Sequence, residues 1–405
     1  MIKFALRRNL IYVLQYIIWS FVRSLIIMFM NALFKFGKSY IFTQFMFIGE
    51  ILAGIIMFFS QRKYNQKKRK ENKEEYFMSI KLIKTQEDED DYFVPLDSKA
   101  KILFLIFFIS FLDIAQFTIC HIHLPRFFNI SQSLCSRLYG LTTIFSLFFY
   151  VYALKLPVYK HHIFSILIIG ICLIAIIASE FYFQIFDIYT SYKSLIITFI
   201  YIILSQILSS SGYSIEKYLF EYDYMNPFVV LMYEGLFGFF ISFLNLIDGN
   251  YFYDFVKIYK DKDSKEFALF IFLLIVFIIL SGGKNLFRIV TTKIYSPMVT
   301  TLLDYVLNPI YLIYYYGAQG DFKKEDGKLD VAYFTINIII SLIISFFGCV
   351  YNEFIILFFC GLERNTHDQV SKRASSKIDE NLTELMKFDE STEMSMNDET
   401  NSVIK

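Results

Sequence analysis

The sequence predicts an all-α, polytopic membrane protein with ten transmembrane helices arranged as two inverted five-helix repeats. Three observations lead to this fold class. Apolar residues make up 56% of the 405 positions, well above the roughly 45–50% that is typical of soluble domains. Ten apolar runs are long enough to cross a bilayer. A segment in the fourth run is similar to a segment in the ninth.

Each run approaches the roughly 20 residues that an α-helix needs to cross about 30 Å of hydrocarbon. Two runs are weaker, because one ends in the polar sequence SSSGYS and another contains Asp304, Asn308 and Pro309. We therefore expect between eight and ten helices. In chain order the predicted spans are 9–33, 40–60, 101–121, 130–153, 162–180, 193–214, 226–247, 267–290, 297–316 and 331–353.

The connections between the runs differ in length and charge. Residues 61–100 form a long charged loop, whereas 154–160 and 221–226 are tight, which predicts neighbouring antiparallel helices. The last segment is polar and rich in Ser and Thr, so it cannot bury a core and we expect it to be disordered. These features divide the chain into a first half at 1–180, a second half at 181–361 and a tail at 362–405.

The distribution of Lys and Arg predicts the orientation. If both termini are cytosolic, the segments on that side hold 26 of the 39 basic residues and the opposite side holds 11. Basic residues collect on the cytosolic side of membrane proteins. The first run lacks a cleavage site after its basic flank, so we expect it to be retained as a helix. The five cysteines lie inside apolar runs without paired spacing, which predicts neither disulfides nor a zinc site.

An internal similarity supports two halves. The sequence from Ser131 to Tyr152 aligns without gaps with the sequence from Ser296 to Gly317, and in both a small or polar start leads into a helix that becomes aromatic. These segments belong to the fourth and ninth runs, so the copies are five runs apart. Halves of five helices have opposite orientations in the membrane, and such inverted repeats place a substrate site near the midplane.

Four acids lie within apolar runs: Glu50, Asp113, Glu234 and Asp304. A charged side chain at a helix centre costs on the order of 2.5–3.5 kcal/mol on insertion scales, and such residues usually face a cavity or a partner. We therefore expect these acids to point inward. Glu50 and Glu234 each lie beside a glycine that permits close helix approach, so a purely structural clamp between helices is the alternative.

The basic residues near the membrane are open to two interpretations. Lys284, Arg288 and Lys293 surround the junction of the eighth and ninth runs, where they could either face the interior or extend to the headgroups. Arg23 lies in a run with uncertain limits, which favours the headgroup interpretation. Gln206 and Asn285 are among the polar residues that could line a cavity, together with Ser and Thr residues that more often bond to their own helix.

No motif of a known enzyme class is present, which predicts that the protein is not an enzyme and uses no cofactor. His121, His123, His161 and His162 lie at the ends of runs with no second group of ligands in sequence, so no metal site is predicted. The basic residues of the segment 62–101 are interleaved with acids. We expect them to meet lipid headgroups or solvent and not nucleic acid.

Residues 204–239, LSQILSSSGYSIEKYLFEYDYMNPFVVLMYEGLFGF, contain an ordered set of short motifs. They resemble the signature between the sixth and seventh spans of the solute carrier 35 family, within the drug/metabolite transporter superfamily, and especially subfamily F, member 6. The matching elements are Glu216-Lys217, Pro227 and the sequence EGLFG at 234–238. MFIGE ending at Glu50, the acid Asp113 and VTTKIYSPMVTTLLD at 290–304 agree in order, so the resemblance covers residues 40 to about 355.

The chain departs from the family at two places. In the fourth span, Ser136 and Tyr139 stand where the family has Gln and Arg, and Arg137 is displaced by two positions. The resemblance leaves open whether Arg137 replaces the family's arginine. The first span also lacks the family's Gly-Ser-x-Asn-Thr pattern.

The resemblance implies a multi-pass transporter of a small polar or anionic metabolite, similar to nucleotide-sugar transporters and working by alternating access. It implies an internal membrane, such as a lysosome-like or Golgi compartment, with both termini cytosolic. The expected partners are a small-molecule substrate and the lipid bilayer, and a homodimer is left open. The predicted substrate-binding residues are Lys293 as the anion contact, Gln206, Asn285 and Asp304, and the predicted gating or helix-locking residues are Glu50, Asp113 and Glu234.

The competing hypothesis is a membrane scaffold or receptor that uses the same fold without transporting a solute. Interior acids locked in pairs with no cavity between the halves would favour the scaffold. An open central cavity lined by Lys293, Gln206 and Asn285 would favour transport.

Overall fold

The structure is a computed structural model, and it describes the greater part of the chain. The described residues are 2–4, 10–34, 40–76, 96–120, 137–155, 158–184, 192–244, 256, 259–260, 263–295, 297–314, 331–358, 361–362, 366 and 369. Most of the predicted tail at 362–405 therefore lies outside the described residues.

The described part of the chain is almost entirely helical, with two short strands. Its elements are β1 (Ile2–Phe4), α1 (Leu10–Phe34), α2 (Tyr40–Tyr76), α3 (Leu96–Thr118), α6 (Gly140–Tyr152), α7 (Lys160–Gln184), α8 (Tyr192–Glu221), α9 (Pro227–Leu244), α11 (Ser264–Ile294), α12 (Pro297–Tyr314), α13 (Val331–Tyr351) and β2 (Ile355–Leu357). Each helix overlaps one of the apolar runs.

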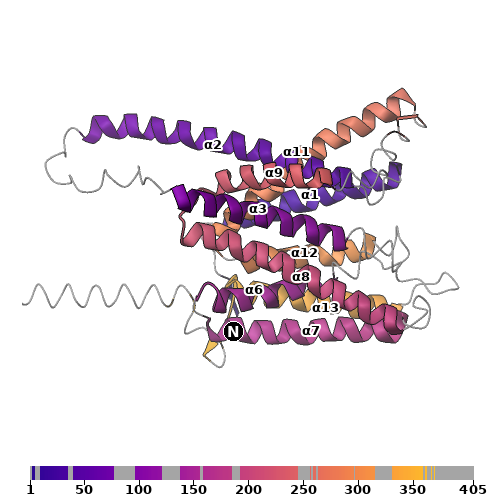
Figure 1. The fold of residues 1–405 in the computed structure, drawn as a ribbon. Helices are drawn as coiled ribbons and strands as arrows, with labels where there is room; N and C mark the ends of the chain where they lie inside the picture. Colours follow the sequence, from indigo (N-terminus) through magenta and orange to yellow (C-terminus); the bar gives the residue numbers. More distant parts are fainter. Residues whose placement is uncertain are drawn as a thin grey trace, which may run out of the picture.

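Seven of these helices are long and apolar enough to cross a bilayer: α1, α2, α3, α7, α8, α11 and α13. Helices α6 and α9 are shorter but also apolar. In Figure 1 the helices lie side by side along roughly one common direction, as in a bundle that crosses a membrane. The chain is therefore a polytopic helical membrane protein, as predicted.

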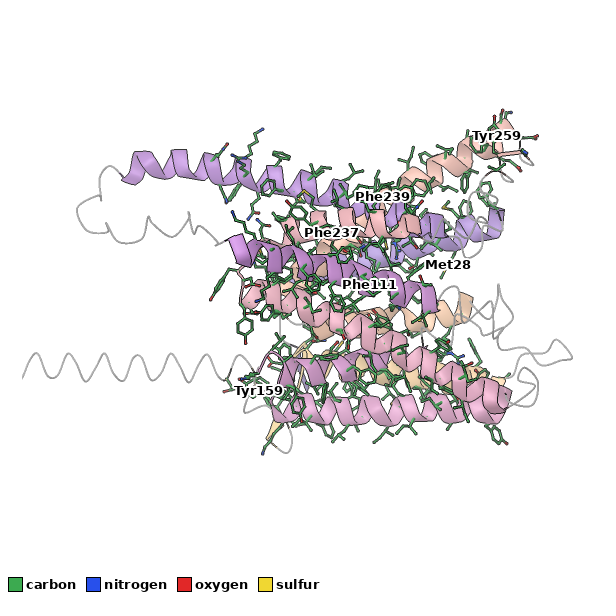
Figure 2. All side chains as sticks on the ribbon, viewed as in Figure 1. Met28, Phe111, Tyr159, Phe237, Phe239 and Tyr259 are labelled. Atoms are coloured by element: carbon green, nitrogen blue, oxygen red, sulfur yellow. The ribbon has the colours of Figure 1, made fainter. Side chains whose placement is uncertain are left out.

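The outward faces of the helices are apolar. On α3, Phe104, Phe108 and Phe111 are all substantially exposed, and Figure 2 labels Phe111 among the side chains of the bundle. Water-soluble proteins rarely expose continuous apolar surfaces of this kind. A surrounding lipid bilayer explains the exposure.

The helices pack in a defined order. Helix α2 packs against α9 and α11, α1 against α11, α3 against α8 and α9, α6 against α8 and α12, and α13 against α7 and α12. Glycines permit the closest of these contacts: a Cβ on Gly54 would lie 2.9 Å from the backbone of Met232, and one on Gly282 would meet the backbone of Gly49. Backbones can approach this closely only where side chains are absent.

Two helices run further than the apolar pattern indicates. Helix α2 continues past residue 60 to Tyr76, and Figure 1 shows it extending beyond the neighbouring helices. Residues 61–76 contain neither Gly nor Pro and are rich in good helix formers, so the helix continues where the membrane segment stops. Helix α8 likewise continues through SSSGYS to Glu221, and within it the hydroxyls of Ser211 and Ser214 donate to the carbonyls of Ile207 and Ser210, so these polar side chains are satisfied by their own helix.

The strands bring the two ends of the described helices together. β1 pairs antiparallel with β2, with Ile2 opposite Leu357 and Phe4 opposite Ile355. Because β2 follows α13 directly, the segment before α1 and the segment after α13 lie at the same end of the bundle.

Candidate functional site

Helix α11 carries two polar side chains into the interior of the bundle. Asn285 and Arg288 are both buried, and residues three apart lie on one face of an α-helix. This face begins one turn earlier at Gly282, where α11 contacts α2. The close approach at the glycine brings the following turn within reach of acids on the neighbouring helices.

Arg288 pairs with acids from two helices. Its Nη2 lies 3.1 Å from Oε1 of Glu234 on α9, and its Nη1 donates to Oε1 of Glu216 on α8. The two carboxylate side chains have exposed fractions of 1% and 0%, and the arginine side chain has 7%. The ring of Tyr213 also lies 5.4 Å from the guanidinium carbon, within the range of a cation–π contact.

A third acid joins the same region through Asn285. The side-chain amide of Asn285 donates to Oε1 of Glu50 on α2, and Glu50 is 2% exposed. Glu50, Glu216, Glu234, Asn285 and Arg288 together form what we call the Arg288 cluster. It joins α2, α8, α9 and α11.

The Arg288 cluster contains more acid than base. Its three buried carboxyl groups face a single guanidinium, and Oε2 of Glu50, Glu216 and Glu234 each has no hydrogen-bonding partner. Isolated charges are costly to bury unless they are paired or neutralised. The cluster therefore needs additional positive charge, either as protons on its carboxyl groups or as a bound cation.

Several predicted site residues meet at this cluster. Glu50, Glu234 and Asn285 belong to it, and Asp113 of α3 is half-buried beside it, where its charge acts on both Glu234 and Arg288. The structure thus brings together residues that the sequence assigned to gating and to substrate binding.

The other predicted residues lie elsewhere or are not described. Gln206 is ten residues before Glu216 on α8, about 15 Å away along the helix axis, and it accepts a hydrogen bond from Thr142 of α6. Lys293 is exposed near the end of α11. Asp304 lies in α12, and its side chain is outside the described residues.

Glu216 is a member of the site that the sequence pattern did not predict, and for Arg288 the pattern left both the interior and the headgroups open. Glu216 follows the polar sequence SSSGYS, at which the apolar pattern ends the sixth predicted span. A stronger signal was available, because no proline occurs between the start of α8 and Pro227 and so nothing stops the helix before Glu216. Arg288 is buried in the cluster, so it does not extend to the headgroups.

Lys217, the neighbour of Glu216, holds the C-terminal end of α11. Its Nζ donates to the carbonyl oxygens of Thr292, Lys293 and Tyr295 at 3.3, 3.0 and 3.1 Å, and it pairs with Glu221 at 2.7 Å. The last carbonyls of a helix have no partner within the helix, and a cation there is favourable. The matched Glu216-Lys217 pair therefore makes two separate contacts with α11.

A second polar region joins α6 to α13. Arg137, next to the start of α6, is 1% exposed, and its Nη1 donates to the hydroxyl of Tyr333 at 2.9 Å and to Oδ1 of Asn337 at 3.0 Å. The two regions are connected through Tyr139 and Tyr213, whose hydroxyls are 2.8 Å apart. Polar contacts therefore extend from the Arg288 cluster toward α13.

Two well-defined cavities in the described part of the chain lie away from the Arg288 cluster. One, of about 360 Å³, is lined by Phe58, Gln61, Arg62, Asn65, Gln66 and Asn226 at one end of α2. The other, of about 10 Å³, adjoins His161 and Glu353. The polar groups of the cluster bond to one another and do not face either cavity.

No known protein-family model matches this chain, and no curated protein matches it at a significant level. The assignment to a polytopic helical membrane protein therefore depends on the sequence and the structure alone.

Proposed function

We propose that the chain is a secondary transporter of the drug/metabolite transporter superfamily, similar to the solute carrier 35 family, which moves a small polar or charged metabolite by alternating access. The Arg288 cluster carries this proposal. Ionisable groups buried within a membrane bundle are costly and usually mark a substrate or proton path. Here they join four helices instead of a single local pair.

The packing order supports two repeated halves. Numbered from one to ten in chain order, the described helices repeat their larger contacts when each number is shifted by five, whereas the smaller contacts of α11 with α8, α9 and α12 and of α12 with α8 have no counterpart of comparable extent. The contact of the first with the eighth (α1 with α11) corresponds to that of the sixth with the third (α8 with α3). The contact of the second with the eighth (α2 with α11) corresponds to that of the seventh with the third (α9 with α3). Two inverted five-helix repeats would produce this correspondence.

The cluster lies where the proposed halves meet. Glu50 and Glu234 are on the second and seventh helices, which correspond to each other and pack together. Arg288 and Asp113 are on the eighth and third helices, which also correspond. These acids and this base lie on corresponding helices, and their pairings would change as one half moves against the other.

The charge balance of the cluster indicates its role in the cycle. With its polar groups bonded to one another, the cluster represents a closed conformation. To open toward one side, Arg288 would have to leave an acid, and a proton or a cationic group would have to replace it. We therefore propose that the cluster couples transport to a proton or a cation, while Lys293 contacts an anionic substrate at the end of α11.

Transport by the purified chain in liposomes tests this proposal. A panel of nucleotide sugars and other charged metabolites would be supplied with and without a pH gradient. We expect Glu234→Gln to abolish the effect of the gradient and Glu266→Gln, at an exposed position in the first turn of α11, to leave it unchanged. If Lys293→Ala leaves a demonstrated rate unchanged, the anion contact is assigned to the wrong residue.

A second candidate function is a scaffold or receptor that does not transport a solute. It is favoured by the interior acids Glu50, Glu216 and Glu234, which are bonded to Asn285 and Arg288, and by the position of the two cavities away from them. Deletion of the gene, followed by metabolite profiling of the organelles, separates the two functions. Unchanged metabolites together with the loss of a membrane protein complex would support the scaffold.

A further inference from the structure

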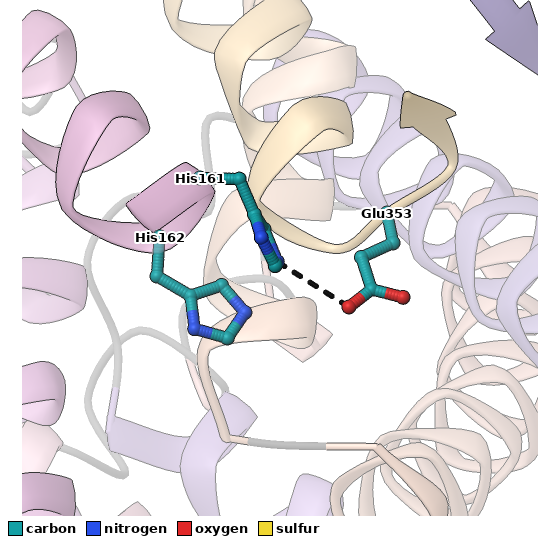
Figure 3. A group of neighbouring side chains, drawn as sticks. All are labelled: His161, His162 and Glu353. Atoms are coloured by element: carbon teal, nitrogen blue, oxygen red, sulfur yellow. Dashed lines mark ion pairs between the residues drawn. The ribbon is translucent and has the colours of Figure 1, made fainter. Parts of the chain in front are cut away.

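Two histidines and a glutamate meet at one end of the bundle, and none of the three belongs to the Arg288 cluster. His161 and His162 lie in the first turn of α7, and Glu353 follows the end of α13. Figure 3 shows the His161 ring and the Glu353 carboxylate facing each other, with the His162 ring beside them. One ligand atom from each of the three side chains lies within 4.8 Å of the other two.

The spacing suits a small divalent cation. The Nε2 of His161 and Oε1 of Glu353 are 3.3 Å apart. In tetrahedral zinc sites with bonds of about 2.0–2.1 Å, neighbouring ligand atoms are separated by about 3.3 Å. This pair therefore already has the separation of two zinc ligands.

Burial makes His161 unusual. It is 2% exposed, and neither of its ring nitrogens has a hydrogen-bonding partner of suitable geometry. The distance from His161 to Glu353 is within the range of an ion pair, but their alignment does not make a hydrogen bond. A buried polar group without a partner costs about 1–3 kcal/mol, and a metal ion on Nε2 would remove that cost.

His162 lies beside His161 and makes contacts of its own. Its Nδ1 accepts a hydrogen bond from the backbone N–H of Tyr159 at 3.3 Å, which is long for an N–H···O or N–H···N bond. The ring lies 4.1 Å from the His161 ring, centre to centre. The ring also packs against those of Tyr159 and Tyr351, with centroids 5.7 and 4.6 Å away. A rotation of His162 that releases its bond to Tyr159 would turn the ring toward a shared ion.

The backbone at the end of α13 directs Glu353 toward α7. Glu353 has a φ of 57°, in the left-handed region that non-glycine residues rarely adopt. The preceding Asn352 donates its side-chain amide to the carbonyl of Gly348 at 2.9 Å. The chain therefore turns sharply after the helix and returns the carboxylate to His161.

The adjoining cavity limits the size of the ligand. It has a volume of about 10 Å³ and is lined by His161, Glu353, Thr366 and the apolar side chains of Val350, Ile355, Ile356, Leu357 and Leu362. About 10–15 Å³ is the space needed for one water molecule. The site admits an ion with a water ligand and excludes an organic molecule.

We propose that His161, His162 and Glu353 bind one zinc ion, which fastens the start of α7 to the end of α13. Two imidazoles and one carboxylate are a ligand set typical of zinc, and water in the adjoining cavity completes the coordination. Helices α7 and α13 already pack together, and β2 follows the glutamate directly. The ion would therefore stabilise the end of the bundle at which β1 and β2 pair. This proposal is independent of the proposed transport function.

Metal binding to the full chain in detergent tests the site. After removal of metals with a chelator, the protein would be titrated with Zn²⁺ alone, and bound metal and thermal unfolding would be measured. We expect about one zinc per chain, an unfolding temperature that rises with zinc concentration, and a visible absorption band of tetrahedral Co²⁺ when cobalt replaces zinc.

Variants decide whether these three residues are the ligands. We expect Glu353→Gln and His162→Gln each to weaken zinc binding at least about tenfold, while a His121→Ala/His123→Ala control, which removes two other histidines, leaves it unchanged. Both ligand substitutions preserve side-chain volume, so they keep the proposal testable if His161→Ala fails to fold. Zinc binding of equal affinity in the ligand variants and the control, or no binding by the folded wild-type chain, would overturn the proposal.

Discussion

At the scale of single residues, Arg288 is the group on which the interior of the bundle depends. Glu216 and Glu234 both bond to Arg288. Glu50 instead bonds to Asn285, which lies about one turn before Arg288 on α11. Removing one partner from a buried ion pair leaves an uncompensated charge and costs about 3–5 kcal/mol. The loss of stability on replacing Arg288 should thus depend on whether Glu216 and Glu234 are still present.

We predict that Arg288→Gln lowers the free energy of unfolding by about 3–5 kcal/mol, because two buried carboxyl groups lose their cation. Chemical unfolding in detergent micelles, followed by tryptophan fluorescence or circular dichroism, would measure the loss. Arg23→Gln is the matched control, because Arg23 is only half-buried and donates to the neutral hydroxyl of Ser281 at 3.0 Å. We expect the control to lose about 1 kcal/mol.

The same residues predict that the stability lost in Arg288→Gln can be recovered by further substitutions. Combining Arg288→Gln with Glu216→Gln and Glu234→Gln removes the buried acids together with their cation, so most of the stability should return. A triple variant that is less stable than Arg288→Gln alone would contradict this account of the cluster.

The sequence identified individual members of the site more readily than their partners. Glu50 and Glu234 stood out because each is an acid surrounded by apolar residues, a signal that is local to the chain. Arg288 and Glu216 are 72 positions apart, and their pairing depends on how α8 and α11 cross, which no local pattern contains. The contact of Asn285 with Glu50 requires α2 and α11 to meet at glycines. The glycine beside Glu50 predicted a close approach of two helices, but no local pattern identified α11 as the partner.

At the scale of helices, α2 and α11 approach each other closely at a pair of glycines. Gly49 and Gly282 face each other across this contact, and a Cβ on either residue would meet backbone atoms of the opposite helix. Backbone atoms cannot move aside as a flexible side chain can. The contact also fixes the height of Glu50, the residue after Gly49, against Asn285, which lies about one turn after Gly282 on α11.

We predict that Gly49→Ala destabilises the protein by about 1–3 kcal/mol, the typical cost of overpacking. Gly170→Ala in α7 is the matched control, since the nearest atom to its added Cβ would be 4.0 Å away. Alanine is the better helix former by about 1 kcal/mol, so the control should be as stable as the wild type or more stable. Unfolding temperatures in one detergent would compare the two, and equal effects would show that close approach is not the cause.

A separate prediction concerns the C-terminal end of α11. Lys217→Met removes the donor that bonds to three carbonyl groups near that end but keeps a side chain of similar length. We expect faster hydrogen exchange at amides 290–295, because the last turn loses its cap. The control is Lys101→Met, which removes an exposed lysine that bonds to Tyr218. Unchanged exchange in Lys217→Met would mean that the carbonyls are satisfied without the lysine.

The apolar pattern predicted where helices cross the membrane better than where they end. The spans at 40–60 and 193–214 correspond to parts of α2 and α8, and both helices continue because hydropathy records the lipid boundary and not the hydrogen-bond ladder. The 61–100 segment is therefore helical at its start and was not predictable as such from charge alone. The similarity between the fourth and ninth runs indicated two halves, but the packing order of the helices came only from the structure.

At the scale of the whole molecule, the number of crossings determines the positions of the ends. Seven helices meet the length and hydropathy expected of membrane spans, and an odd number of crossings would place the two ends of the bundle on opposite sides of the bilayer. The pairing of Ile2–Phe4 with Ile355–Leu357 brings these two segments together, so we expect both ends to lie on the same side of the bilayer. We therefore predict an even number of crossings, and counting α6, α9 and α12 as spans would give ten.

We predict that epitope tags placed before Ile2, within 77–95 and after 369 are all accessible from one side, and that tags within 35–39 and 315–330 are accessible only from the other. Ten alternating crossings give this pattern, because the first three positions are separated from one another by even numbers of helices and the last two follow an odd number. The positive-inside bias further predicts that the first three face the cytosol. Antibody access before and after selective permeabilisation of the cell measures each tag. A tag after 369 that reports the opposite side from a tag before Ile2 would mean an odd number of crossings, and it would exclude both the inverted repeat and the native pairing of β1 with β2.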